Sequence, residues 1–318
     1  PPFGVGTVGA RSPGDRGAPR FPLAIQRRDV RVAIDGDPAV TEVDEVFFNP
    51  ASDKVEGIYQ FRTPQGATMS RFGVDRDGVV VWGRVKEKTA AAAQYQANVY
   101  QGSTEDPALL EWDAPGVYRA RLYPIGPGET RRVVVRYTQW LERSGKRGER
   151  RHYVFPMAAE GSEGSLPHIE FFGATFDLQR ALAREVRTGM RGVHKSGEVI
   201  VRAHDLVPRS DLSLELFDEG RSATRVYRAP HVLDLEVLPP DQRQEAKIKA
   251  SDEKDYVMVP IRAVDVPKVQ GGLDLVIVVD ASAATDAASL ALSRATVGAL
   301  LAHMGGDDRA VVWAGDAG

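Results

Sequence analysis

The sequence predicts a mainly β protein whose last part changes to an α/β pattern. Hydrophobic residues recur at every second position from about Phe21 to Met157, and a second strand-rich stretch runs from His168 to about Pro240. Near the C-terminal end a continuous apolar run, LDLVIV, precedes a helical pattern. Alternation with a period of two is typical of strands that bury one face. We therefore expect an antiparallel β-sandwich, a second β-rich region and then the first βαβ unit of a doubly wound α/β domain.

Composition sets limits on the class of protein. The chain has 318 residues, of which 42% are hydrophobic, and this is enough for two or three cores. The net charge of −3 does not call for nucleic acid or an anionic membrane as the partner. No run of about 18 apolar residues is present, so we expect no membrane insertion. The absence of cysteine excludes disulfides, cysteine nucleophiles and thiolate metal sites.

Residues 1–20 are rich in Gly, Pro and Arg and show no periodicity, which predicts a disordered linker or arm. They contain GVGTVG, Gly4 to Gly9, which fits the pattern G-x-G-x-x-G. A dinucleotide site needs a strand before this motif and a helix after it, and the flanking residues PPF and ARSPGDRG predict neither.

Residues 21–157 carry the signals of the sandwich. VRVAID and AVTEVDEVFF alternate, and Asp77-Gly78 between two strand-like runs predicts a hairpin. KEKTAAAAQYQANVYQG, from Lys86 to Gly102, contains good helix formers and ends at glycine, so we expect one inserted helix. Four aromatic residues fall at strand spacing and are expected in the core: Phe47, Tyr59, Phe61 and Phe72.

AAEGSEGSLPH, at residues 158–168, predicts a boundary, after which we expect a β-rich linking region over residues 168–267. The pattern changes within residues 272–318. LDLVIVVD is typical of a strand that is buried on both faces, and Ala287 to Met304 carries helical spacing. DDRAVVWAG then reads as a further strand, so we expect an incomplete α/β domain here, whose remainder lies in a longer chain, has been cleaved off or comes from a partner.

Together these segments resemble a VIT domain (vault protein inter-alpha-trypsin domain) followed by the start of a von Willebrand factor A domain. The resemblance is carried by AVTEVDEVFFNPASDKVEGIYQFRTP, GRVKEKTAAAAQYQANVYQG, ALLEWDAPGVYRARLYPIGPGETRRVVVRYTQWL, YVFPM and LDLVIVVDASAA. The stretch from Thr175 to Pro240 resembles the linking region of inter-alpha-trypsin heavy-chain-like proteins. The resemblance implies an extracellular or structural interaction protein with no catalytic residues to carry over.

The loop VVDASAATD contains the candidate metal ligands. In A domains the pattern D-x-S-x-S, with a Thr and an Asp from later loops, binds Mg²⁺ or a similar divalent cation. Asp280 and Ser282 match this pattern, but Ala284 stands at the third position and has no side-chain oxygen. The resemblance therefore implies a degenerate metal-dependent adhesion site. We expect Asp280 and Ser282 to cap the following helix or to bond the loop backbone.

The sequence thus predicts a non-enzymatic interaction or scaffold protein of VIT and von Willebrand A type, whose partner is another protein. Two alternatives stay open. One is a protease substrate or inhibitory partner in a bacterial proteolytic or defence system, cleaved within or near the A domain. The other is a hydrolase with a dispersed active site, because the members of a Ser-His-Asp triad are distant in sequence. The resemblance and the composition favour a bacterial periplasmic, cell-surface or extracellular location.

Overall fold

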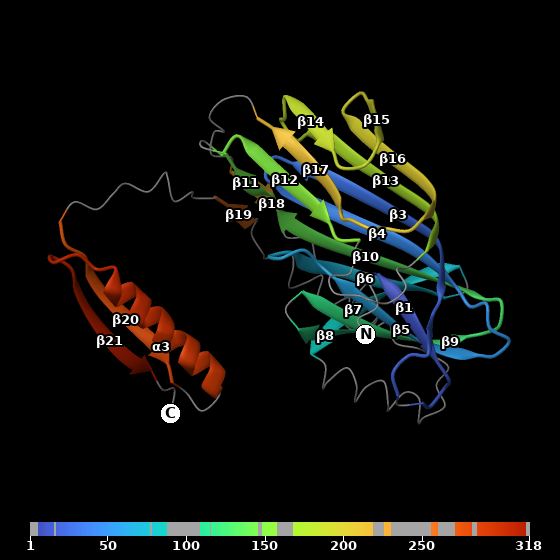
Figure 1. Ribbon diagram of the computed structural model, residues 1–318, viewed down its shortest axis with the longest axis horizontal. Helices are drawn as coiled ribbons and strands as arrows, with labels where there is room; N and C mark the ends of the chain where they lie inside the picture. Colours follow the sequence, from blue (N-terminus) through green and yellow to red (C-terminus); the bar gives the residue numbers. More distant parts are fainter. Residues whose placement is uncertain are drawn as a thin grey trace, which may run out of the picture. The chain divides into compact units, whose positions relative to one another are not determined.

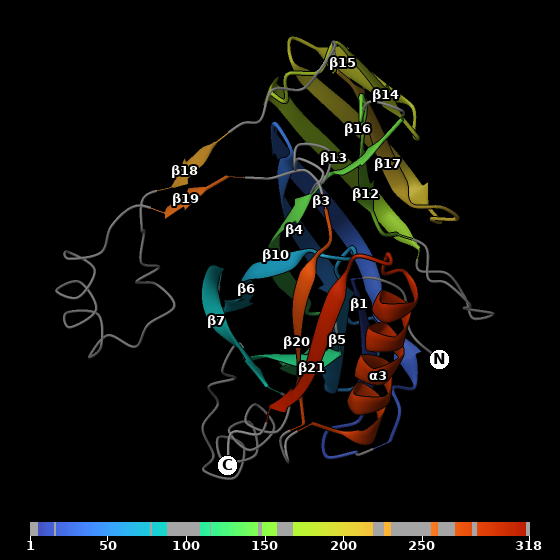
Figure 2. The same ribbon diagram turned by 90° about the vertical axis from the view of Figure 1, so that its left-hand side faces the viewer.

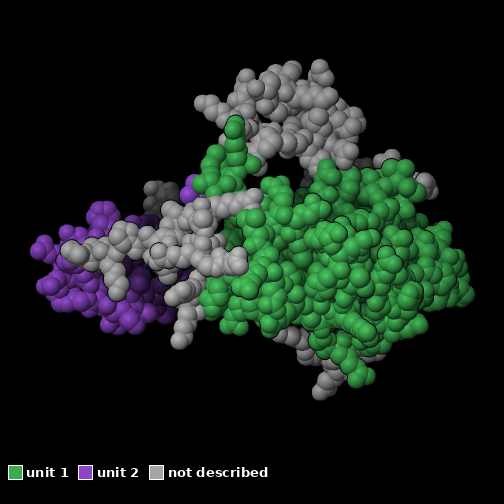
Figure 3. All heavy atoms as spheres, turned by 90° about the horizontal axis from the view of Figure 1, so that it is seen from above, with its two compact units in different colours: residues 1–258 green, residues 259–318 purple. Residues whose placement is uncertain are grey.

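The computed structural model divides the chain into two compact units, residues 1–258 and residues 259–318 (Figure 3). The residues that the structure describes are 6–15, 17–76, 78–87, 109–114, 116–145, 148–157, 168–218, 226–229, 256–259, 271–281 and 285–315. The described part is mainly β, as the sequence predicted.

The first unit is built on one large sheet of 13 strands. Its first half consists of β15 (Gly192–Lys195), β16 (Glu198–Leu206), β13 (Ile169–Arg180), β3 (Ala24–Asp35), β4 (Pro38–Phe48), β10 (Thr130–Trp140), β6 (Thr68–Arg76) and β7 (Val79–Glu87). After β7 the order continues through β8 (Leu109–Ala114), β9 (Val117–Ile125), β5 (Val55–Arg62), β1 (Thr7–Arg11) and β2 (Phe21–Pro22). We call β13, β3, β4 and β10, which Figure 1 shows as long neighbouring arrows, the central strands.

Two further sheets belong to the same unit. A sheet of four strands contains β11 (Glu142–Ser144), β12 (Arg150–Phe155), β17 (Leu212–Phe217) and β14 (Glu185–Thr188). A short ribbon pairs β18 (Tyr227–Ala229) with β19 (Tyr256–Met258). Figure 2 shows β18 and β19 of this ribbon side by side. The ring of Tyr227 on β18 lies edge-on to Trp140 of β10, with 5.5 Å between the ring centroids.

The inner face of the central strands is covered by two different layers. Toward one end it packs on the second half of the large sheet, where Phe47 of β4 contacts Tyr59 of β5 at 6.0 Å between ring centroids. Toward the other end it packs on the four-stranded sheet, where Tyr153 of β12 is hydrogen-bonded to Thr41 of β4 at 2.9 Å and contacts Phe176 of β13. The four aromatic residues that the sequence placed in the core, Phe47, Tyr59, Phe61 and Phe72, are all buried.

The N-terminal segment differs from the expected disordered arm, because Thr7–Arg11 forms strand β1. β1 is antiparallel to β5, and Val8 and Ala10 are fully buried. The two strands approach closely because Gly57 of β5 has no side chain: a Cβ there would lie 2.7 Å from Cγ1 of Val8. Small residues that allow tight strand packing are the same residues that made this segment look unstructured in the sequence.

The predicted boundary at residues 158–168 does not separate two compact units. β13, which follows it, pairs in parallel with β3 inside the large sheet, so the expected β-rich region from residue 168 shares its core with the sandwich. Within the predicted inserted helix, Lys86 and Glu87 belong to β7. The remainder of that prediction, residues 88–102, lies outside the described residues.

The second unit contains β20 (Asp274–Asp280), α3 (Ala287–Ala302) and β21 (Arg309–Gly315). β20 and β21 are parallel neighbours, so the order strand, helix, parallel strand is present in the region where the sequence predicted it. The likeness of this unit to a von Willebrand A domain stays a prediction. Among the helices that the structure describes, none is long and apolar enough to cross a membrane.

Candidate functional site

The predicted metal loop is only partly described. Asp280 is the last residue of β20 and lies opposite Gly315 of β21, while the next backbone N–H, that of Ala281, donates to the carbonyl oxygen of Gly315 at 2.8 Å. Asp280 is therefore at the carboxyl end of a parallel strand, as the sequence predicted. Ser282 and Ala284 lie outside the described residues.

The residue that caps helix α3 is Asp286, so the predicted capping by Asp280 or Ser282 is wrong. The other predicted role of these two residues, bonding the loop backbone, stays a prediction. Oδ1 of Asp286 accepts a hydrogen bond from the backbone N–H of Ser289 at 2.7 Å. This bond stabilises the ionised carboxylate and lowers the pKa of Asp286 below its ordinary value. The reason is position: α3 begins at Ala287, so only the residue directly before it has the geometry of an N-cap.

These residues do not fit a complete divalent-cation site. Mg²⁺ demands near-octahedral oxygen coordination, and Ala284 supplies no side-chain oxygen where the family pattern has a hydroxyl. The nearby carboxylate of Asp286 is engaged by the helix backbone. Within the described ranges no three His, Asp or Glu side chains lie close enough together to hold a metal ion. We therefore assign no role to a metal here.

The candidate site is instead the outer face of the central strands, on the side of the sheet opposite the core. Alternation along β3 sends Val30, Val32 and Ile34 into the core and leaves Arg31 and Ala33 on the solvent side. β4 and β10 alternate in the same way, so charged side chains of neighbouring strands meet on this face.

One row of charges crosses β3, β4 and β10. Arg31, Glu42 and Arg136 lie directly opposite one another in the strand register. Nη1 of Arg31 donates to Oε1 of Glu42 at 3.1 Å, and Nη2 of Arg136 donates to Oε2 of Glu42 at 2.6 Å. A single carboxylate thus lies between two guanidinium groups, and the row carries a net positive charge.

A second row of charges lies two to four residues away along the same strands, and its arginines are diagonal to Asp44 rather than directly opposite it. Arg132 of β10 binds Asp44 of β4 through two hydrogen bonds of 2.8 and 2.7 Å, which raise the pKa of Arg132. Arg27 of β3 forms an ion pair with Asp29 at 2.7 Å and reaches toward Asp44 at 3.9 Å. Because the charges of this row balance, the excess positive charge belongs to the row of Arg31 and Arg136.

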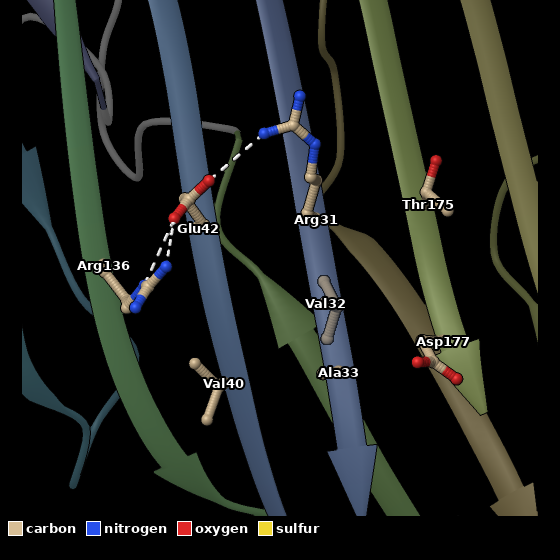
Figure 4. Close-up of a pocket in the computed structure, with 8 residues that line it drawn as sticks. All are labelled: Arg31, Val32, Ala33, Val40, Glu42, Arg136, Thr175 and Asp177. Carbon is tan, nitrogen blue, oxygen red and sulfur yellow. Dashed lines mark hydrogen bonds and ion pairs between the residues drawn. The ribbon is translucent and has the colours of Figure 1, made fainter. Parts of the chain in front are cut away.

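A shallow depression of about 300 Å³ lies beside the first row, and Figure 4 shows the residues that line it. We call it the outer groove; its lining residues are Arg31, Val32, Ala33, Val40, Glu42, Arg136, Thr175 and Asp177. Ala33 and Val40 are cross-strand neighbours and form an apolar floor, because both side chains are short beside the long arginines. Asp177, on β13, stands at the opposite side of the groove from Arg136.

The inner face of the same strands contains a buried ion pair. Nε of Arg28 donates to Oε1 of Glu45 at 2.7 Å, and the hydroxyl of Tyr59 donates to Oε2 at 2.9 Å. Arg28 also donates to the backbone carbonyl of Gly6, just before β1. Burial raises the pKa of Glu45, while the positive charge of Arg28 opposes that shift. Because these groups are sealed from solvent, their role is to hold β1 and β5 against the central strands.

Sequence reasoning did not identify the outer groove. The signal that could have found it is the placement of charged residues on one face of each strand: at alternate positions in RRDVRVAID and TEVDEV, and four residues apart in TRRVVVRY. Pairing these segments requires the strand register, and β13 enters the groove through a parallel pairing with β3 that no local pattern predicts.

Three solved structures to which the chain is similar are distant in sequence. A candidate nutrient-binding protein from Legionella pneumophila is 10% identical, with a TM-score of 0.41 over 68% of this chain and 73% of that chain. An M1 zinc metallopeptidase from Deinococcus radiodurans is 15% identical, with a TM-score of 0.31 over 69% of this chain and 46% of that chain. Leukotriene A4 hydrolase from Saccharomyces cerevisiae is 7% identical, with a TM-score of 0.35 over 73% and 34% of the two chains.

The chain spans less than half of the length of these two enzymes, and likenesses this distant assign no function. No curated protein sequence matches the chain significantly. The match to a family model is specific: residues 25–137 match the vault protein inter-alpha-trypsin domain. These residues contain nearly all of β3, the whole of β4 to β9 and most of β10, and this part of the chain is therefore a VIT domain, as the sequence predicted.

Proposed function

We propose that the chain is a non-enzymatic protein-interaction module and that the outer face of its central strands is the contact surface. The observation that carries the proposal is the contrast between the two faces. The inner face is covered by two layers, whereas the outer face leaves Arg31, Val40 and Arg136 accessible beside the outer groove.

The VIT domain supports this reading, because such a domain suggests a role in protein interaction or as a scaffold. The physical character of the outer face agrees with it. Charged rows with fixed partners favour specific contacts, since a partner must match the order of the charges and mismatched charges are penalised. Arginine is also enriched in protein interfaces, where its planar head binds carboxylates through paired hydrogen bonds.

Site-specific photo-crosslinking in cells that make the protein tests the proposal. A photoreactive amino acid replaces Val40, which is 40% exposed on the outer face. In a second variant it replaces Arg202, an exposed residue of β16 that is on the same face because it lies opposite Gly173, the neighbour of Asp29. The matched control is Val207, which is 41% exposed and follows β16.

We expect discrete adducts with a partner protein from the two outer-face positions and none from Val207. The adduct from Val40 is expected to disappear when Arg136 is changed to Glu. If neither outer-face position gives an adduct above the control, the outer face is not the contact surface and the proposal is wrong.

A further inference from the structure

The outer groove carries opposite charges at its two sides. Arg31 and Arg136 flank Glu42 along one wall, so this wall is positive overall. Asp177 lies on the neighbouring strand β13, where its Oδ1 accepts a hydrogen bond from the backbone N–H of Gln179 at 3.0 Å. Among the described residues Asp177 forms no ion pair, so its negative charge is available to a ligand.

The floor between the charges is apolar. Ala33 and Val40 face each other across β3 and β4, and Asp177 lies opposite Ala33 on the other side of β3. Burying an aliphatic side chain against this floor removes apolar surface from water, which contributes about 25 cal/mol for each Å². The groove therefore offers, in order across the strands, the negative charge of Asp177 on β13, the apolar floor on β3 and β4, and the positive charge of Arg136 on β10.

The spacing of these three features fits an extended chain. β13 and β10 are three strand intervals apart in the sheet, which corresponds to about 14 Å at the usual interstrand distance. An extended segment advances about 3.3 Å for each residue, so residues i and i+4 are about 13 Å apart. Residues i, i+2 and i+4 also point to the same side of an extended segment.

We propose that the outer groove binds an extended segment of a partner protein that crosses the central strands and presents a basic, an aliphatic and an acidic side chain at alternate positions. The basic side chain pairs with Asp177, the aliphatic one covers Ala33 and Val40, and the acidic one pairs with Arg136 and Arg31. This inference rests on the proposed function and names the chemistry of the partner.

The guanidinium of Arg31 can donate further hydrogen bonds to an acidic side chain of the partner. Its Nη1 donates to Glu42, its side chain is 61% exposed, and its other nitrogens point away from Glu42 (Figure 4). The acidic residue of the partner thus completes a row in which carboxylates and guanidinium groups alternate. A groove of about 300 Å³ is at the small end of pockets that enclose whole ligands, and it fits a few side chains of a segment lying on the surface.

Synthetic peptides are the probe. One peptide contains Lys, Val and Asp at alternate positions separated by Ser, and a second contains the same three residues in reverse order, because the groove does not fix the chain direction. A third peptide of equal composition has Lys and Asp adjacent, so it cannot reach both sides of the groove. Binding is measured by isothermal titration calorimetry at low ionic strength, where exposed charge pairs are least screened.

We expect one of the two ordered peptides to bind more tightly than the adjacent-charge peptide by roughly threefold to tenfold, the range of two exposed ion pairs and one apolar contact. Reversing Arg31 to Glu is expected to remove this preference. The double variant R31E/D177K is expected to bind the ordered peptide of the opposite direction better, because the row then has two carboxylates beside Arg136 and is negative overall, while position 177 is positive.

The matched control is Arg20→Glu. Arg20 is 65% exposed and forms an ion pair with Asp15 at 3.2 Å, close to the 61% exposure and 3.1 Å of Arg31 and Glu42. This control is expected to leave peptide binding unchanged. Circular dichroism and the denaturant midpoint establish that each variant is folded.

The possible outcomes separate the two proposals. Equal binding of all three peptides, or a preference that survives R31E/D177K unchanged, overturns the groove assignment, while a photo-crosslink from Arg202 still supports the interaction function. If crosslinks from the outer face are also absent, both proposals are wrong. An ordered peptide preference that follows the charge exchange supports the groove even where the cellular partner is a different protein.

Discussion

Two Arg–Glu pairs join the same two strands and have opposite roles. Arg28 lies opposite Glu45, and Arg31 lies opposite Glu42, in one continuous register of β3 and β4. An offset of three residues places the pairs on opposite faces of the sheet. The side chains of the inner pair are 1% and 0% exposed, whereas those of the outer pair are 61% and 20% exposed. The burial of the pair, rather than its chemistry, decides whether its charges are enclosed in the fold or exposed to solvent.

The partners of each pair show the same difference. The inner pair is completed by the hydroxyl of Tyr59 on β5 and by the carbonyl of Gly6, just before β1. The outer pair is extended by a second arginine, Arg136, along the surface. The inner arrangement therefore connects layers of the core, and the outer arrangement displays charge to solvent.

The largest effect is expected from Glu45→Gln. This variant keeps the size of the side chain but leaves the charge of Arg28 buried without a counter-charge, which typically lowers the free energy of unfolding by about 3–5 kcal/mol. Urea unfolding followed by fluorescence measures it. A loss below about 1 kcal/mol would show that the inner pair behaves like an exposed one and would remove the contrast.

The double variant R28M/E45M is the control for that experiment. Replacing a buried ion pair by apolar residues of similar volume is often neutral or stabilising. We therefore expect it to recover most of the stability that Glu45→Gln loses. A double variant as unstable as the single one would mean that the bonds to Gly6 and Tyr59, rather than the unpaired charge, dominate.

A smaller loss is expected from Gly6→Ala. Gly6 has φ of +65°, and a Cβ there would lie 2.5 Å from Oε1 of Glu45 and 2.9 Å from Nη2 of Arg28. Strain and overpacking of this kind lower the free energy of unfolding by roughly 1–3 kcal/mol. Hydrogen exchange of the β1 amides shows whether the loss of stability is concentrated in β1. Gly14→Ala is the control, because φ there is +80° but nothing lies within 4 Å of the added Cβ.

On the outer face, Glu42→Gln is expected to change the free energy of unfolding by less than about 1 kcal/mol, because both partners remain solvated. The change should shrink further as salt is added, since exposed charges are screened. Parallel urea titrations at low and high salt measure it. A loss that is as large as that of Glu45→Gln and insensitive to salt would contradict the division between the faces.

The smallest effect concerns Asp286, an exposed carboxylate held by backbone rather than by an arginine. Its pKa is lowered below the ordinary value of 3.8 by the N–H of Ser289. A group with a lowered folded-state pKa stabilises the fold above its unfolded pKa, and this contribution is lost as the pH falls through the folded-state value. NMR titration of the Asp286 carboxyl measures the midpoint. The contribution of this carboxylate to the pH dependence of stability should vanish in Asp286→Asn. A titration midpoint at or above 3.8 would contradict the predicted lowering of the pKa.

The sequence predicted which side chains face the core, but it did not predict the contacts between side chains on either face. Period-two alternation placed Phe47, Tyr59, Phe61 and Phe72 in the core, because burial follows directly from the face on which a side chain lies. It left open which arginine meets which carboxylate, since a shift of register by two residues preserves every face and changes every partner.

Two further features depend on information that a local pattern does not hold. Strand β1 was missed because its small residues signal flexibility in isolation and close packing only opposite Gly57. In the predicted metal loop, residue type identified Asp280 and Ser282, but the cap of α3 is set by where the helix begins, which is at Ala287. Boundaries of elements are decided by hydrogen bonds that the pattern of hydrophobic residues leaves unspecified.

The parallel pairing of β13 with β3 has a consequence for the order in which the protein assembles. Strand β3 can form a hairpin with β4 as soon as both are synthesised, but Ile25 meets its parallel neighbour Ile169 only after the whole segment that contains the VIT domain has been made. Contacts between such distant residues slow folding, because a long loop must close first. During that interval the second edge of β3 is open, and an unpaired strand edge is a site of wrong association. The charged side chains of Arg27, Asp29 and Arg31 along β3 disfavour pairing of this open edge with another chain.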